Sequence, residues 1–143
     1  MLGVNPYIAF KGNCQEAIDF YTNALGGEVL GIQKYGNSQM AEMGPADKIM
    51  HCSMKIGESN IMLCDDMRPD AGAVGGNISL AVGLNDTAKA KSMFNNLAEG
   101  GSVTMPLDKT FWAEAFGMLT DKFGINWMVN CDAPQSEEKA AAS

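Results

Sequence analysis

The sequence contains one histidine, His51, in a segment that can bring it beside a carboxylate. This segment, "KIMHCSMKIGESNIMLCDD", predicts a β-hairpin with its turn at residues 57–59. If Ile56 pairs with Asn60, counting back along both strands places His51 opposite Asp65. The spacing therefore predicts a histidine–carboxylate pair on neighbouring strands.

Such a pair has two readings. A carboxylate can fix the tautomer of a neighbouring imidazole and raise its basicity, which suits a general base. The same pair can also be a structural hydrogen bond at the end of a strand. A two-residue turn would make Asp66 the partner of His51. The sequence thus gives His51 and Asp65 as candidate catalytic residues, with both readings open.

Alternation along this hairpin separates polar from apolar side chains, because successive residues of a strand point to opposite faces. In the chosen register one face carries His51, Ser53, Lys55 and Asp65, and the resemblance described below implies that this face is the inward, ligand-facing one. The outward, apolar set is Met50, Cys52, Met54, Ile56, Met62 and Cys64.

A second hairpin is predicted over residues 111–132, "FWAEAFGMLTDKFGINWMVNCD", with a tight turn at "TDKFGI". If Thr120 faces Ile125, Phe116 packs under a helix together with Met118, and Gly117 leaves open space on the ligand-facing side. The candidate ligand-binding residues, on these strands or at their rim, are Ser53, Asn77, Ser79, Trp112, Glu114, Asn126, Met128 and Asn130.

Two helices must support these hairpins. Apolar residues recur with spacing i, i+3, i+4, i+7 and i+8 near residues 14–25 and again near 87–98. Asn13 is the expected N-cap of the first helix, in a capping box with the glutamate three residues on, and Asn85 or Asp86 that of the second. A short apolar strand precedes each helix and three strands follow it, so that the chain reads as two copies of one pattern.

This pattern predicts an α+β fold made of tandem βαβββ modules, which form a curved sheet around a cleft with the helices on the outer face. We expect a single domain over residues 1–132, with modules at about 5–66 and 77–132. Residues 67–76, rich in Gly and Asp, are the expected linker, and residues 133–143 the expected flexible tail.

Composition limits the function classes. The chain has 143 residues, four scattered cysteines and a net charge of −7. This charge disfavours nucleic acid and favours a cationic ligand. No apolar run is long enough for a membrane span, no secretory leader is visible, and cysteines without C-x-x-C spacing favour a cytoplasmic protein.

The segments "PYIAFKGNCQEAIDFY", "MLCDDM", "TFWAEAFG" and "DKFGINWMVN" resemble, in this order, the PhnB-like branch of the vicinal oxygen chelate superfamily. This superfamily includes glyoxalase I, bleomycin-resistance proteins and extradiol dioxygenases. The branch often carries the label 3-demethylubiquinone-9 3-methyltransferase. The sequence has no glycine-rich loop between a strand and a helix of the kind that holds a nucleotide-like cofactor. The resemblance also implies a homodimer.

The resemblance further implies where a metal would bind, because metal-using members take one ligand from each of four strands. The corresponding positions here are Pro6, Leu63, Asn77 and Met128. These residue types cannot form a hard, anionic site for a divalent ion. We therefore expect no metal and no other cofactor.

Three functions remain open on these observations. The first is binding of a small polar or oxygenated metabolite in a metal-free cleft, with His51 as a general base. The second is a non-catalytic protein that sequesters a small molecule, such as a cation. The third is a metal-dependent lyase, isomerase or dioxygenase whose metal site has been rearranged.

Overall fold

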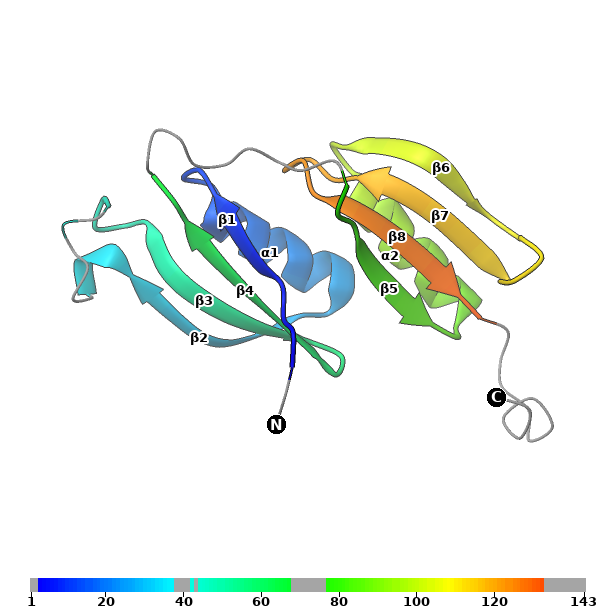
Figure 1. Ribbon diagram of the computed structural model, residues 1–143, viewed down its shortest axis with the longest axis horizontal. Helices are drawn as coiled ribbons and strands as arrows, with labels where there is room; N and C mark the ends of the chain where they lie inside the picture. Colours follow the sequence, from blue (N-terminus) through cyan, green and yellow to red (C-terminus); the bar gives the residue numbers. More distant parts are fainter. Residues whose placement is uncertain (1–2, 38–41, 43, 68–76, 133–143) are drawn as a thin grey trace. The chain divides into compact units, whose positions relative to one another are not determined.

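The computed structural model describes residues 3–37, 42, 44–67 and 77–132. The chain forms two compact units, Met1–Ala73 and Val74–Ser143, and each contains one strand–helix–strand–strand–strand module (Figure 1). The expected α+β class and the two βαβββ modules are confirmed. The expected linker and tail lie, apart from Met67, outside the described residues.

The first module contains one helix and four strands. The helix is α1 (Cys14–Leu25), and the strands are β1 (Tyr7–Phe10), β2 (Glu28–Lys34), β3 (Ile49–Ile56) and β4 (Ser59–Asp65). A short 3₁₀ helix, η1 (Tyr35–Asn37), follows β2. The strands form a mixed sheet in the order β1-β4-β3-β2, in which only β1 and β4 are parallel.

The second module repeats this topology. The helix is α2 (Thr87–Ala98), and the strands are β5 (Leu80–Leu84), β6 (Ser102–Asp108), β7 (Ala115–Thr120) and β8 (Asn126–Cys131). Their order is β5-β8-β7-β6, with β5 and β8 parallel. In both modules the helix covers one face of its own sheet (Figure 1). We call the opposite face of each sheet its helix-distal face.

The cores form where each helix meets its sheet. The residues of α1 that are buried are Cys14, Ala17, Ile18, Tyr21, Ala24 and Leu25. They share the interior with the alternate residues of β3 and β4 that point the same way, including Cys52, Met54 and Leu63, each 0% exposed. Burying side chains of this size stabilises a module by about 1.5–3 kcal/mol per residue. Neither predicted helix needs revision, since both span the expected residues.

The two helices begin differently. In α2 the expected cap is confirmed, because the Asp86 carboxylate accepts a hydrogen bond from the Lys89 amide at 3.0 Å. In α1 the capping prediction is wrong, since the Asn13 side chain makes no capping hydrogen bond. The carboxylate of Asp65, at the end of β4, accepts a hydrogen bond from the Cys14 amide at 2.9 Å instead.

Asp65 joins three segments of the first module. One carboxylate oxygen accepts hydrogen bonds from the amides of Gly12 and Cys14, and the other from the amide of Ile49, each at 2.9 Å. The residue is 1% exposed. A buried carboxylate with several backbone donors is well satisfied, whereas the donors would lose their partners if it were removed.

Both predicted hairpin registers are wrong by one residue. In the first, Ile56 pairs with Ser59 across a two-residue turn that starts with Gly57, whose φ is 58°. Glycine at this position is typical of a type II′ turn. In the second, Thr120 pairs with Asn126. Because side chains alternate, a slip of one residue moves a whole strand's side chains to the other face.

The longer turn of the second hairpin is organised by a buried aspartate. One oxygen of Asp121 accepts hydrogen bonds from the amides of Phe123 and Ile125, and the other accepts one from Trp127 Nε1 at 2.9 Å. Gly124 has a φ of 86°, a left-handed conformation that favours glycine. The carboxylate therefore fixes both the turn and the position of the buried Trp127 ring.

Replacing Asp65 by Asn should destabilise the protein by roughly 2–4 kcal/mol, because the amide group cannot accept all three backbone hydrogen bonds. Urea unfolding followed by circular dichroism measures this change. Glu58→Gln, in the exposed turn of the first hairpin, is the matched control and should stay within about 0.5 kcal/mol of the parent. Equal stabilities of the two variants would contradict the structural role of Asp65.

The second register can be tested with two glycines. A Cβ on Gly117 would lie 2.7 Å from Phe94 Cε2 and 2.9 Å from Leu107 Cα, whereas one on Gly83 meets nothing within 4 Å. We expect Gly117→Ala to cost about 1–3 kcal/mol and Gly83→Ala to be near neutral in the same unfolding assay. A neutral Gly117→Ala would place this residue on the helix-distal face and restore the original register.

Candidate functional site

The helix-distal face of the first module collects polar and reactive side chains from neighbouring strands. Tyr7 on β1 pairs with Met62, which in turn pairs with Ser53 on β3. One step along, Ala9 pairs with Cys64 on β4, and His51 pairs with Gln33 on β2. The residues of this face are Tyr7, Ala9, Gln33, His51, Ser53, Lys55, Asn60, Met62 and Cys64.

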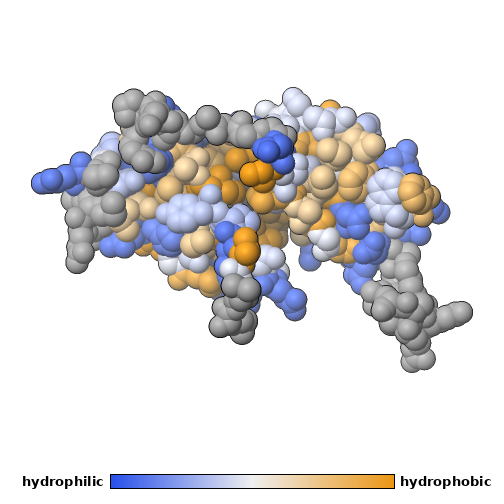
Figure 2. All heavy atoms as spheres, viewed as in Figure 1, coloured by the Kyte–Doolittle hydropathy of each residue, from blue (hydrophilic) through white to orange (hydrophobic). Residues whose placement is uncertain are grey.

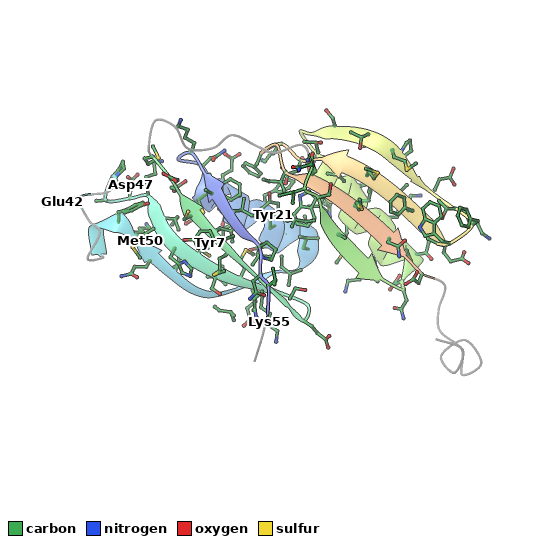
Figure 3. All side chains as sticks on the ribbon, in the orientation of Figure 1. Tyr7, Tyr21, Glu42, Asp47, Met50 and Lys55 are labelled. Carbon is green, nitrogen blue, oxygen red and sulfur yellow. The ribbon has the colours of Figure 1, made fainter. Side chains whose placement is uncertain are left out.

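His51 lies on this face as expected, but its neighbour is a tyrosine. The Tyr7 hydroxyl oxygen is 3.4 Å from His51 Nδ1, at the long end for a hydrogen bond. The two ring centroids are 5.8 Å apart, with the planes inclined by 58°. Figure 3 labels Tyr7 on β1, with Met50 and Lys55 near the two ends of β3. Ser53 and Lys55 share the face of His51, as predicted.

Asp65 does not orient His51, and that prediction is wrong. The observed register places Asp65 opposite Phe10 on the face that packs against α1, where both side chains are buried. Its carboxylate is occupied by the three backbone amides described above. The possible partner Asp66 is also excluded by the register, since continuing it beyond Cys52 and Leu63 brings Cys64 opposite His51.

Tyr7 keeps its proton at neutral pH. Burial raises the pKa of Tyr7 to about 12, and the nearby Cys64 adds to this shift. The side chain as a whole is 54% exposed, so the ring edge remains accessible from solvent. A neutral phenol can donate a hydrogen bond to a ligand oxygen or pass a proton between two neighbours.

Sequence reasoning missed Tyr7 and misplaced Cys64. The signal for Tyr7 is the alternation in "YIAF", where Ile8 is partly buried and Phe10 buried against the helix, so that Tyr7 and Ala9 must point the other way. No comparable signal identified Cys64, because its orientation depends on the length of the turn between β3 and β4.

The helix-distal face of the second module is less polar. Asn126, Met128 and Asn130 point to this face, as predicted, and Trp127 and Val129 pack under α2. The expected positions of the β7 side chains are wrong: Phe116 and Met118 lie on the helix-distal face, and Gly117 lies under Phe94 of α2. Figure 2 views this sheet from the helix-distal side and shows hydrophobic atoms along β7 and β8.

Three rows of paired residues cross this face. The first row is Ser102, Thr120 and Asn126; the second is Met105, Met118, Met128 and Ala81; the third is Asp108, Phe116, Asn130 and Gly83.

Some polar groups of this face already make hydrogen bonds within the module. Thr120 Oγ1 donates to Asn126 Oδ1 at 2.9 Å, and Asn126 Nδ2 donates to the Ile78 carbonyl at 3.1 Å.

The remaining candidate ligand-binding residues of the second module are exposed. Trp112 is 50% exposed and contacts Phe116 and Phe111 edge to face, with ring centroids 5.3 and 4.8 Å apart. Glu114 is exposed beside β7, and Asn77 and Ser79 are exposed ahead of β5. Trp112, which the sequence placed at the rim, therefore belongs to an aromatic cluster with Phe111 and Phe116.

The side chains at the four inherited metal positions do not fit a divalent ion. Leu63 is 0% exposed and faces α1, and the backbone of Pro6 accepts a hydrogen bond from the Met62 amide. In the part of the chain that the structure describes, no three His, Cys, Asp or Glu side chains are grouped as a metal would require. Apolar and amide groups bind hard divalent cations too weakly to retain them.

We expect purified protein to retain no stoichiometric divalent metal after dialysis against a metal-free buffer. Inductively coupled plasma mass spectrometry should find well below one Zn, Ni, Mn or Fe per chain. A content near one would contradict this expectation and direct attention to His51 and Cys64. His51→Gln and Cys64→Ser should then lower the content, with exposed Lys91→Gln as the control.

Comparisons with known proteins agree with this fold. A model of the Glyoxalase/Bleomycin resistance protein/Dioxygenase superfamily matches residues 3–129. Protein YjdN of Escherichia coli is 34% identical over 138 residues, which cover 89% of this chain and 93% of that protein. None of the helices that the structure describes is long and apolar enough to cross a membrane.

Two solved structures are similar over most of both chains. Protein PA1353 from Pseudomonas aeruginosa is 42% identical, with a TM-score of 0.81 over 94% of this chain and 100% of that one. The PhnB protein from Bacillus cereus, described as a putative 3-demethylubiquinone-9 3-methyltransferase, is 23% identical, with a TM-score of 0.79 over 91% and 99%. The tandem βαβββ modules and the match over residues 3–129 together establish that this chain belongs to the glyoxalase/bleomycin resistance protein/dioxygenase superfamily.

Proposed function

We propose that this protein binds a small polar or oxygenated metabolite on the helix-distal face of its first module, with His51 at the centre of the site. The observation that supports this proposal is the separation of the two faces of the sheet. Apolar side chains and the satisfied Asp65 carboxylate lie against α1, whereas Tyr7, His51 and Ser53 share the opposite face.

The pair of rings suits a ligand with a carbonyl or hydroxyl oxygen. The Tyr7 hydroxyl can donate a hydrogen bond, and a neutral imidazole can accept one proton and donate another. His51 lies 3.4 Å from that hydroxyl, so one ligand oxygen can contact both groups. General-base catalysis by His51 would then proceed without a carboxylate partner.

A second candidate function is sequestration of a small cation without chemistry. Two observations favour it, the net charge of −7 and the exposed aromatic cluster of Phe111, Trp112 and Phe116 in the second module. Aromatic ring faces attract ammonium groups, more strongly when the ring is partly desolvated. Loss of binding in Trp112→Ala with retention in His51→Gln would favour this function over the first.

The name given to the Bacillus cereus protein does not transfer to this chain. The connections that lead into the two helices, residues 11–13 and 85–86, are short and contain a single glycine. Neither forms a glycine-rich turn that could hold the phosphate or sugar of a nucleotide-like cofactor. We therefore propose a reaction or a binding role that needs no such cofactor.

Substitution of His51 by Gln tests the proposed site. A thermal-shift screen of 2-oxo acids, hydroxy acids and quaternary ammonium compounds identifies a ligand, because binding to the folded state raises the melting temperature. With a ligand found, His51→Gln should weaken its binding by about 1 kcal/mol, the value of a hydrogen bond. If His51 is a general base, turnover should fall by ~10²–10⁴-fold with little change in affinity.

Lys91→Gln, on the exposed side of α2, is the matched control, because it removes a polar side chain far along the chain from the proposed site. Isothermal titration calorimetry measures the affinity of each variant. Unchanged affinity and turnover in His51→Gln, in a protein that still binds the ligand, would refute the placement of the site.

A further inference from the structure

A thiol lies beside the His51–Tyr7 pair. Cys64 is on β4, opposite Ala9 of β1, and the register that pairs Cys52 with Leu63 brings Cys64 next to His51 on the helix-distal face. Three strands therefore contribute a phenol, a thiol and an imidazole to one small region. None of these three side chains belongs to the core against α1.

The Tyr7 hydroxyl lies near both of the other groups. It is 3.4 Å from His51 Nδ1, and Cys64 is close enough to raise its pKa. For transfer of the thiol proton, the Cys64 thiol donates to the Tyr7 oxygen and the Tyr7 hydroxyl donates to His51 Nδ1. In this arrangement the hydrogen bonds run from sulfur to phenol to imidazole. Such a chain can carry the thiol proton to the imidazole while the phenol stays neutral.

The other three cysteines are in different surroundings. Cys14, Cys52 and Cys131 are each 0% exposed, whereas Cys64 is partly exposed. Burial raises the pKa of both the Cys14 and the Cys52 thiols, which keeps them protonated and unreactive. Cys131 contacts Thr87 Oγ1 at 3.9 Å under α2. These three buried cysteines thus serve as internal controls when the reactivity of Cys64 is measured.

Ala9 determines the space around the sulfur. It is the direct neighbour of Cys64 on β1, and its side chain is a single exposed methyl group. A small neighbour at this position covers less of Cys64 than a longer side chain on β1 would. The partly exposed thiol can therefore be approached from the same side as the proposed ligand.

We propose that Cys64 is a nucleophile that adds to α,β-unsaturated carbonyl compounds, with His51 as the proton acceptor and Tyr7 as the link between them. This inference rests on the proposed site at His51 and specifies one class of ligand for it. The thiol proton passes to the imidazole, and the thiolate forms an S–C bond with the β-carbon. The π electrons of the alkene move to the α-carbon, which takes the proton back from the imidazolium. All atoms of thiol and alkene remain in the thioether product, and no oxidant or cofactor is needed.

N-Ethylmaleimide, an activated alkene, is the probe. The reduced full-length protein is treated at pH 7.5, and peptide mass spectrometry measures the rate of adduct formation at each cysteine. Cys64 should react at least about tenfold faster than glutathione, and the three buried cysteines far more slowly. A Cys64 rate at or below that of glutathione would overturn the proposal.

Variants test the roles of the neighbours. His51→Ala should slow the reaction of Cys64 by about tenfold, and free imidazole should restore part of the rate, which a purely structural role of His51 would not allow. Tyr7→Phe should slow it as well, and Lys91→Gln should leave it unchanged. A Cys64 rate that is the same in His51→Ala and the parent, with both proteins folded by circular dichroism, would refute the assignment. If His51→Ala does not fold, the Cys64 rate in Tyr7→Phe is compared with that of the parent, and equal rates refute the assignment.

The Cys64→Ser variant separates this inference from the proposed function. It should retain binding of a non-electrophilic ligand from the thermal-shift screen while losing covalent labelling at position 64. Normal labelling kinetics at Cys64 without any His51-dependent binding would instead count against the proposed site and leave the reactivity of the thiol established.

Discussion

The carboxylate of Asp65 is the contact on which the first module depends. It lies at the end of β4, and its three hydrogen bonds reach the backbone before α1, the first residue of α1 and the start of β3. A charge in this position is stable because every bond comes from an oriented backbone donor, and one of these donors belongs to a helix N-terminus. Since β4 lies between β1 and β3, fixing its end also fixes the registers on both sides.

The second module obtains the same topology with different polar contacts. The last residue of β8 is Cys131 where β4 has Asp65, and its sulfur contacts Thr87, the first residue of α2. Asp86, the residue directly before α2, caps this helix, and Asp121 organises the hairpin turn. Two copies of one fold therefore distribute their buried carboxylates differently, so symmetry of topology does not imply symmetry of sites.

The two helix-distal faces differ in chemistry for the same reason. Once the registers are fixed, the first face receives a phenol, an imidazole and a thiol from three strands. The second receives amides, methionines and Phe116, and the Asn126 amide already makes two hydrogen bonds inside the module. The first face thus carries side chains that can exchange protons, while the second offers apolar and aromatic contact surface.

The secondary structure and the repeat follow from local sequence patterns. Helical periodicity places α1 and α2 at the expected residues. The apolar side chains that a helix buries must recur with the 3.6-residue period of its backbone. The position of His51 on the face away from the helix also follows from alternation along β3. Family-specific segments such as "PYIAFKGNCQEAIDFY" indicate the superfamily from the sequence.

Which residues meet across strands depends on contacts between segments that are distant in sequence. Turn length depends on Gly57 in one hairpin and on the buried Asp121 in the other, and neither effect is visible in the alternation of polar and apolar residues. Each error of one residue exchanged the faces of a strand: Asp65 moved into the core and Cys64 out beside His51. Periodicity fixes the direction of side chains within a strand, whereas the pairing between strands is set by hydrogen bonds between residues distant in sequence.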